Sequence, residues 1–221
     1  MRALIVIAKA PIPGFAKTRL VGRSGFDQAF VARLADAFVR DTLRNCRRAA
    51  PAELLISFAP ADALSYFRAL DDRARLLPQA DGDLGDRLRG ALRSAFDAGA
   101  ERALLLGCDT PHLAPSSIDD AFARLDESPG VIGPAVDGGY YLLGLREPRD
   151  DLFRDIEWST PRVAEQTLAR ARAMGLELAR LPEVLDVDEP GDVEHLREIL
   201  AREPELAPNT ARVLSERRQH G

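Results

Sequence analysis

The residues best suited to chemistry in this sequence begin with a basic loop near its start. The segment from Lys9 to Leu20 reads KAPIPGFAKTRL and comes directly after a short apolar run. Two prolines and a glycine make its backbone irregular, and three basic side chains are available to an anion. We interpret it as a binding site for a nucleotide's phosphates, the alternative being a solvated basic loop. The predicted nucleotide-binding residues here are Lys9, Ala10, Pro11, Gly14, Lys17 and Arg19.

The charge of this loop contrasts with the rest of the sequence. The net charge is -5, yet no acidic residue occurs between Arg2 and Phe26, a stretch that also contains Arg23. Among 30 basic residues the only lysines are Lys9 and Lys17, and both lie in the loop. This placement favours a site that needs a compact ammonium rather than arginine's planar fork. The loop matches neither a Walker A motif nor a G-x-G-x-x-G fingerprint.

Aspartates that follow two later apolar runs are candidate metal ligands. Asp109 stands in GCDTPH after the run 103–107, and a carboxylate there can bind Mg²⁺ or Mn²⁺. In DVDEPGD, Asp186 and Asp188 are two residues apart, so on an extended segment both point the same way and either offers a second carboxylate. The alternatives are a turn-forming Asp109 and carboxylates that cap a helix beginning near Pro190.

Two more segments are candidates for binding an acceptor. The sequence DGGY at 137–140 separates two apolar runs, which is typical of a hairpin, and its glycines also allow close backbone approach. Trp158 can stack on a sugar or base, although WSTP is also the pattern of a helix start with Thr160 as cap and Pro161 as first helical residue. His112 is either a general base or an ordinary loop histidine. The predicted substrate-binding residues are Asp137, Gly138, Gly139, Tyr140 and Trp158.

These candidates must be positioned by strands that alternate with helices. Apolar runs without polar interruption are typical of strands buried in a mostly parallel sheet with helices on both faces. In such sheets ligands bind beyond the carboxyl ends of the strands, where the clusters above fall. We predict strands at 4–8, 54–58, 75–78, 103–107, 131–136, 140–145 and 176–181, helices near 31–38, 63–70, 85–98, 116–125, 161–174 and 190–201, and an appended helix or tail at 204–221.

Composition limits the class of protein. A length of 221 residues with 46% hydrophobic and 29% charged residues suits one globular domain, which we expect to span residues 1–221. No apolar run approaches the roughly 20 residues of a membrane span, and the run at 3–8 reads as a buried strand rather than a secretory signal, so we expect a cytoplasmic protein. The negative charge argues against nucleic-acid binding. Cys46 and Cys108 fit neither a disulfide framework nor a zinc site.

The motifs KAPxPGxxKTRL, GCDTP, DGGYY and DVDxPxD resemble those of the bacterial rSAM/selenodomain-associated transferase 1 family, related to arsenosugar-biosynthesis glycosyltransferases, over most of the chain. They are also similar to molybdenum-cofactor guanylyl- and cytidylyltransferases and to phospholactate guanylyltransferase. The resemblance implies a Rossmann-like GT-A fold, three layers α/β/α around a mostly parallel mixed sheet. It implies that Lys17 and Arg19 belong to a phosphate-binding loop, and that Asp109 and Asp188 are the two metal-binding aspartates.

The same resemblance implies that the segment 79–87 approaches the nucleotide base. The contacts would come from Gln79 and from Gly82, Asp83 and Leu84, whereas the alternative makes Asp83 a helix cap in a flexible loop. The first loop lacks the Gly-Gly pair of the molybdenum-cofactor enzymes, and position 109 has one aspartate rather than Asp-x-Asp. These departures leave the reaction subtype open.

We therefore predict an enzyme with a nucleotide or nucleotide-sugar donor and a small-molecule acceptor, and no prediction is made of its oligomeric state. Glycosyl transfer from a nucleoside-diphosphate sugar comes first, with nucleotidyl transfer from a nucleoside triphosphate to a small phosphorylated acceptor as the alternative. A non-catalytic nucleotide-binding module is the third possibility. In either reaction the catalytic residues would be Lys17, Arg19 and Asp109, with the cations offsetting charge on the departing group.

Overall fold

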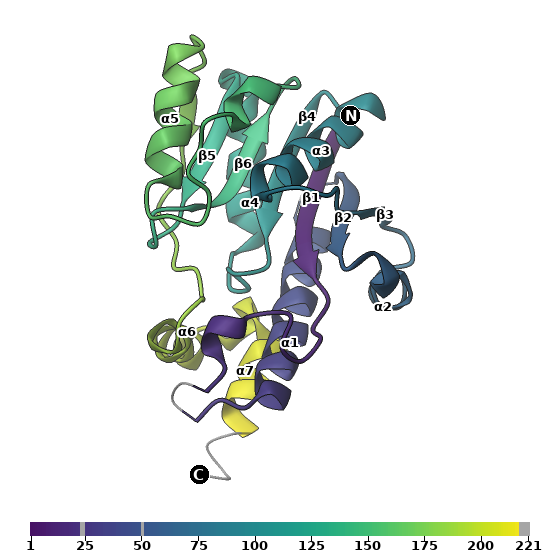
Figure 1. Ribbon diagram of the computed structural model, residues 1–221, viewed down its shortest axis with the longest axis vertical. Coiled ribbons are helices and arrows are strands. Elements are labelled where there is room, and N and C mark those ends of the chain that lie inside the picture. The colour runs from purple at the N-terminus through teal and green to yellow at the C-terminus, as the bar shows by residue number, and fades with distance from the viewer. Residues whose placement is uncertain (23–24, 50, 217–221) are drawn as a thin grey trace.

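A mixed β-sheet forms the centre of the protein. The computed structural model describes residues 1–22, 25–49 and 51–216, and within these ranges a seven-stranded sheet has the order β3-β2-β1-β4-β6-β5-β7 (Figure 1). Only β6 runs antiparallel to its two neighbours in this described sheet. The strands are β1 (Arg2–Lys9), β2 (Glu53–Ala59), β3 (Arg75–Pro78), β4 (Arg102–Gly107), β5 (Gly130–Pro134), β6 (Tyr140–Leu145) and β7 (Leu178–Arg180).

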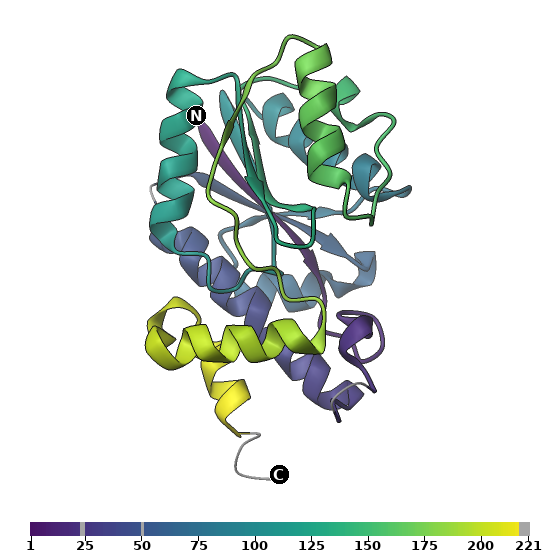
Figure 2. The ribbon, with the colours of Figure 1, turned by 90° about the vertical axis from the view of Figure 1, so that its left-hand side faces the viewer.

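Helices cover both faces of this sheet. Apolar residues of α1, α2 and α4 pack on one face, and those of α3 and α5 pack on the other. Figure 2 shows α4 and α5 on opposite sides of the strands. The helices are α1 (Gln28–Arg48), α2 (Leu64–Leu70), α3 (Leu84–Asp97), α4 (Pro115–Glu127), α5 (Val163–Ala173), α6 (Pro190–Arg202) and α7 (Pro208–Glu216), with 3-10 turns η1 (Thr18–Leu20), η2 (Ala61–Ala63), η3 (Asp150–Phe153) and η4 (Pro204–Leu206).

The two-sided burial of β1 follows from the alternation of side chains along a strand. Leu4 and Val6 belong to the cluster beneath α1 and α4, while Ala3 and Ile5 belong to the cluster beneath α3 and α5. All four are at most 1% exposed, so neither face of β1 contacts water. This is why the sequence reads as an unbroken apolar run, as expected for a central strand of a parallel sheet.

The C-terminal helices pack on α1 through a third apolar cluster and through a buried polar contact. Asp41 in α1 is 0% exposed and accepts hydrogen bonds from the backbone N–H and the side chain of both Asn209 and Thr210, at 2.7–3.1 Å. These bonds satisfy donors at the beginning of α7. One turn further along α1, the amide of Asn45 donates to the carbonyls of Pro111, Leu113 and Leu206.

Most predicted elements are confirmed, with corrections at their ends. The hairpin of β5 and β6 is antiparallel as predicted. Helix α5 begins at Val163 with Arg162 at its N-cap, so the prediction of Thr160 as cap and Pro161 as first helical residue was wrong. Thr160 instead donates to the Glu157 carbonyl at 2.7 Å and closes a turn. Strand β7 is shorter than predicted, and α1 is longer.

The C-terminal segment predicted as a helix or tail contains η4 and α7, and its last residues, 217–221, lie outside the described ranges. Within those ranges, every helix is too short or too polar to cross a bilayer.

Candidate active site

The loops after β1 and β4 meet at the carboxyl edge of the sheet. Parallel pairing aligns Lys9 with Ala59 and Ile7 with Gly107, so β1, β2 and β4 end together. The basic loop therefore begins beside the point where the chain turns toward Asp109. The same edge is the usual position of ligands in open α/β sheets.

The segment after β7 returns along this edge and brings the later aspartates to it. Val184 forms a parallel bridge with Ala135, next to the β5–β6 hairpin. The N–H of Val187 then donates to the carbonyl of Asp109 at 2.9 Å. Because the Val187 side chain is 0% exposed and packs with the C-terminal helices, the flanking Asp186 and Asp188 side chains point the other way, into the site.

Lys17 joins the basic loop to both acidic segments. Its Nζ lies 2.6 Å from Asp109 Oδ1 and 2.7 Å from Asp188 Oδ1, and it donates to the Val187 carbonyl at 2.6 Å. The Lys17 side chain is 9% exposed, and its ammonium also lies 5.8 Å from the centre of the Phe38 ring. Burial acts to lower the pKa of Lys17, but the two carboxylates outweigh it and the pKa is raised. Lys17 is therefore a charged, nearly enclosed link between the three segments.

The other basic residues of the loop are more exposed. Arg19 Nη1 lies 3.5 Å from Asp188 Oδ2, and the Arg19 side chain is 59% exposed. Lys9 is exposed, with its Nζ 5.9 Å from the centre of the Phe15 ring. Arg23 lies outside the described residues. The predicted convergence of Lys17, Arg19, Asp109 and Asp188 at one sheet edge is thus present in the structure.

A carboxylate cluster adjoins Lys17, and one of its members was not predicted as a ligand. Oxygen atoms of Asp137, Asp186 and Asp188 all lie within 4.8 Å of one another. Burial, followed by the charge of Asp137, raises the pKa of Asp186 to about 7. Burial acts to raise the pKa of Asp188, but Lys17 outweighs it and the pKa is lowered. The sequence offered Asp186 as an alternative to Asp188, whereas the structure places both at the site.

The role of Asp137 in its hairpin explains why sequence reasoning did not assign it as a ligand. Its Oδ1 accepts a hydrogen bond from the Gly139 N–H at 2.7 Å, as a turn-forming aspartate does. The sequence did not indicate a metal role because Asp137 and Asp186 are far apart along the chain. The long-range bridge of Val184 with Ala135 brings their segments together. Asp137 therefore stabilises the hairpin turn and is also a candidate metal ligand.

The segment predicted to approach a base lies at the ends of β1–β3. Gln79 donates through its side chain to the carbonyls of Ala8 and Ser57, at 3.3 and 2.9 Å. Asp83 caps α3 in a reciprocal capping box with Asp86, so the capping interpretation of Asp83 is confirmed. Gly82 precedes it at φ 114, a conformation that favours glycine. Leu84, the first residue of α3, is 39% exposed.

The hairpin turn contacts the loop that contains Trp158. Gly138 has φ 89, and a Cβ there would lie 2.0 Å from the Pro161 carbonyl oxygen, so glycine is required for this close approach. Trp158 stacks on Phe153, with ring centres 6.4 Å apart, and its Nε1 would lie 2.5 Å from a Cβ at Gly85. Phe153, Trp158 and Gly85 line a cleft of about 270 Å³ beside the N-terminal turn of α3.

Two other polar candidates, His112 and Tyr140, are buried or partly buried. His112 is buried at 9% exposure, burial lowers its pKa to about 4, and among the described residues its Nδ1 has no hydrogen-bond partner. Tyr140 is partly buried, and burial raises the pKa of its hydroxyl. A larger cavity, about 590 Å³, is lined by Arg102 at the amino end of β4, opposite the edge that holds the aspartates. We therefore place the candidate active site at the carboxyl edge.

Comparison with known proteins identifies the family. A family model described as "Uncharacterized protein conserved in bacteria (DUF2064)" matches residues 42–160, more than half of the chain. The chain belongs to this family. The DUF2064 match spans β2 to the loop of Trp158 and includes Asp109 and Asp137. The narrower resemblance to rSAM-associated transferases stays a prediction.

Two proteins resemble the DUF2064 chain over nearly its full length. A solved structure from Desulfovibrio desulfuricans G20, described as a nucleotide-diphospho-sugar transferase, is 33% identical with a TM-score of 0.90 and covers 97% of this chain and 94% of its own. A phosphoenolpyruvate guanylyltransferase of Conexibacter woesei is 28% identical over 204 residues, 91% of this chain and 90% of the relative. The relatives thus include transferases that use nucleotides, and the predicted α/β fold class is confirmed.

A more distant structure shares the fold alone. Rv0371c of Mycobacterium tuberculosis H37Rv, solved in complex with manganese, has a TM-score of 0.56 at 16% identity and covers 89% of this chain and 97% of its own. Manganese is therefore found in one protein with this fold.

Proposed function

We propose that this protein is a metal-dependent transferase that moves a nucleotidyl group from a nucleoside triphosphate to a small phosphorylated acceptor. The observation that carries the proposal is the contact of Lys17 with Asp109 and Asp188. It brings the basic loop after β1, which is suited to phosphates, next to carboxylates that are suited to a metal. The similarity to a phosphoenolpyruvate guanylyltransferase over 91% of the chain supports nucleotidyl transfer in particular. We therefore put it ahead of glycosyl transfer, reversing the order that the sequence suggested.

The carboxylates fit a hard divalent cation. Oxygen ligands are what Mg²⁺ and Mn²⁺ prefer, and oxygens of Asp137, Asp186 and Asp188 are close enough to share one ion. Burial, followed by the charge of Asp137, raises the pKa of Asp186, and a bound cation would favour its charged form. We propose Asp109 and Asp188 as principal ligands, with Asp186 and Asp137 beside them. A bound cation would supply charge neutralisation to the donor's phosphates.

The remaining residues have positioning and electrostatic roles in this proposal. Arg19 is exposed enough to contact the phosphates, and Lys17 and Lys9 add positive charge at the same edge. An acceptor oxygen attacks the α-phosphorus as the bond to the β-phosphate oxygen breaks, and pyrophosphate leaves with its charge offset by these cations. We propose that the base extends toward Gln79 and the start of α3, and that the acceptor binds beside the hairpin of Asp137.

Glycosyl transfer is the second candidate function. The solved structure described as a nucleotide-diphospho-sugar transferase is 33% identical and superposes with a TM-score of 0.90. The same residues would then bind a sugar donor's pyrophosphate, with a nucleoside diphosphate as the leaving group. The two reactions differ in donor and in product, which makes them separable by experiment.

A donor panel tests the proposal. The purified protein is offered ATP, GTP, CTP, UTP or nucleoside-diphosphate sugars with Mg²⁺ or Mn²⁺, and its melting temperature is measured, because a ligand of the native state stabilises it by mass action. Candidate phosphorylated acceptors, phosphoenolpyruvate among them, are then added while released pyrophosphate is assayed. Stabilisation by triphosphates with acceptor-dependent pyrophosphate release supports nucleotidyl transfer. Stabilisation by nucleotide sugars alone favours the second candidate, and no stabilisation by any donor refutes both.

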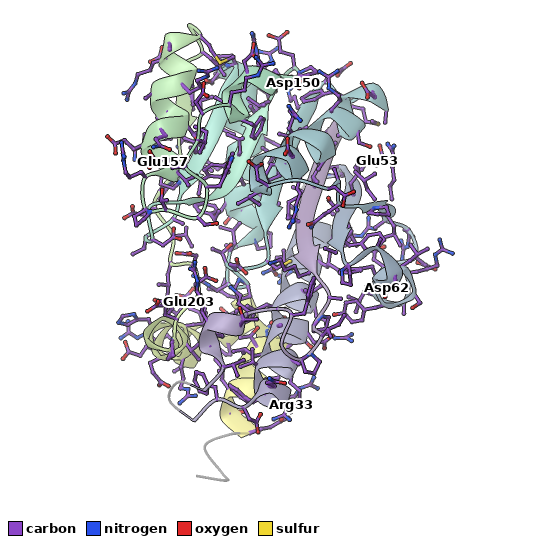
Figure 3. All side chains as sticks on the ribbon, viewed as in Figure 1. Arg33, Glu53, Asp62, Asp150, Glu157 and Glu203 are labelled. Atoms are coloured by element: carbon purple, nitrogen blue, oxygen red, sulfur yellow. The ribbon has the colours of Figure 1, made fainter. Side chains whose placement is uncertain are left out.

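A substitution tests the site. Asp109→Ala should reduce metal-dependent turnover at least about a hundredfold while preserving the fold, because it removes a proposed ligand that is 50% exposed rather than part of the core. Asp62→Ala, which removes an exposed carboxylate in η2, is the matched control and should retain activity (Figure 3). Equal turnover by the two variants would show that Asp109 has no role in the reaction.

A further inference from the structure

The Lys17 ammonium has no donor left for a phosphate. A lysine ammonium has three N–H donors. Three oxygens surround it, Asp109 Oδ1 at 2.6 Å, Asp188 Oδ1 at 2.7 Å and the Val187 carbonyl at 2.6 Å. In this arrangement Lys17 cannot also bind a nucleotide's phosphate.

The same contacts compete with a metal ion. Asp109 and Asp188 are the proposed principal ligands, and each has an oxygen within 2.7 Å of Lys17 Nζ. The second oxygen of Asp188 lies 3.5 Å from Arg19. A divalent cation bound to these carboxylates would repel an ammonium held this close, since like charges in a partly buried site are weakly screened. The present Lys17 position and a filled metal site therefore compete for the same carboxylates.

The backbone at Lys17 indicates that this position is held under strain. Lys17 has φ 53 and ψ 40, the left-handed region that a side chain with a Cβ rarely adopts. Such strain persists where surrounding contacts enforce it. In the described structure this conformation accompanies the three contacts of the ammonium.

We propose that Lys17 is an exchangeable counter-ion of the carboxylates. It neutralises Asp109 and Asp188 in the metal-free protein, a divalent cation displaces its ammonium, and the released ammonium then binds the donor's phosphates. The inference rests on the proposed function and adds a regulation of the same site, namely that cation and donor bind cooperatively. By thermodynamic reciprocity, the donor must raise the cation's affinity by the same factor.

Amine labelling gives a direct readout because the chain has only two lysines. A brief pulse of acetylating reagent, followed by mass spectrometry, reports each lysine separately. Without metal, buried Lys17 should react much more slowly than exposed Lys9. Saturating Mn²⁺ should raise the labelling rate of Lys17 at least about fivefold and leave that of Lys9 nearly unchanged, with sodium chloride of equal ionic strength as the control. Added pyrophosphate should protect Lys17 again.

Metal affinity provides the second measurement. Titration of Mn²⁺, with the free ion followed by electron paramagnetic resonance, compares the natural protein with Lys17→Met. The variant should bind Mn²⁺ at least about tenfold more tightly, because no ammonium has to leave. Lys9→Met makes the same charge change in the same loop and should alter the affinity much less. Pyrophosphate should strengthen Mn²⁺ binding to the natural protein more than to Lys17→Met.

The outcomes separate this inference from the proposed function. Binding of Mn²⁺ with Lys17 still protected, or equal Mn²⁺ affinity in the natural protein and Lys17→Met, would overturn the exchange while leaving a metal-dependent transferase intact. Binding by Lys17→Met alone would also overturn the exchange, because the ammonium of the natural protein would then block the site and not leave it. Failure of both proteins to bind Mn²⁺ would refute the metal site and the exchange together.

Discussion

Replacing Asp186 with asparagine should stabilise the metal-free protein at neutral and alkaline pH. Burial and the neighbouring charge of Asp137 raise the pKa of Asp186 from 3.8 to about 7. The folded state therefore holds this proton more tightly than the unfolded state does. Its loss destabilises the fold progressively as the pH rises from about 4 to about 7. Asp186→Asn has no charge to lose and should escape this destabilisation.

The size of the effect follows from the pKa. A shift from 3.8 to about 7 corresponds to about 4 kcal/mol when each unit contributes about 1.4 kcal/mol. Asp186 is only partly buried, and solvent screening reduces this to about 2 kcal/mol. For a chain of this size, that stabilisation raises the melting temperature by about 4–8 °C.

Thermal unfolding followed by circular dichroism at several pH values from 4 to 8.5, with a chelator present, measures this difference. The gain of Asp186→Asn over the natural protein should be largest at pH 8.5 and shrink toward pH 4. Glu53→Gln, which removes a carboxylate from the first residue of β2, is the charge-matched control and should show no such trend (Figure 3). A gain independent of pH, or a loss of stability at pH 8.5, would refute the reasoning.

Two further predictions concern a buried base and a glycine. Burial lowers the pKa of His112 from 6.5 to about 4, so the stability linked to its neutral form is present above about pH 6.5 and lost as the pH falls toward 4. Urea unfolding is compared at pH 7 and 4.5, where His112→Gln should remove about 2 kcal/mol of this acid sensitivity, and an unchanged pH dependence would contradict it. Gly138→Ala should destabilise the protein by about 2–4 kcal/mol and shift the fluorescence of its single tryptophan, because the new Cβ would lie 2.0 Å from the Pro161 oxygen. Gly191→Ala, with open space around its Cβ, is the control, and equal fluorescence changes in both would count against the steric argument.

The sequence was sufficient to predict which segments meet. Apolar runs identified β1 and β4 as central parallel strands, and the carboxyl ends of such strands share an edge. The loop of Lys17 and the turn of Asp109 were therefore expected to be neighbours, and they lie in direct contact. The alternation of Asp186 and Asp188 about buried Val187 followed from the geometry of an extended segment.

Side-chain direction and long-range pairing were beyond sequence reasoning. The left-handed conformation of Lys17, which accompanies its buried position among carboxylates, cannot be predicted from the residues around it in the sequence. The place of Asp137 beside Asp186 depends on how the segment after β7 crosses the hairpin. The start of α5 was predicted two residues too early, because Thr160 forms a turn where a cap was expected.

The burial of Asp41 has a consequence for which segment can cover this side of α1. Its carboxylate is enclosed, and the donors that satisfy it come from Asn209 and Thr210, 168 and 169 residues later. A different segment packed at this place without such donors would enclose the carboxylate unsatisfied, which is costly. The packing of α7 on α1 is therefore selective as well as apolar, because only a segment that brings these donors to Asp41 can cover that side of α1 without leaving its carboxylate unsatisfied.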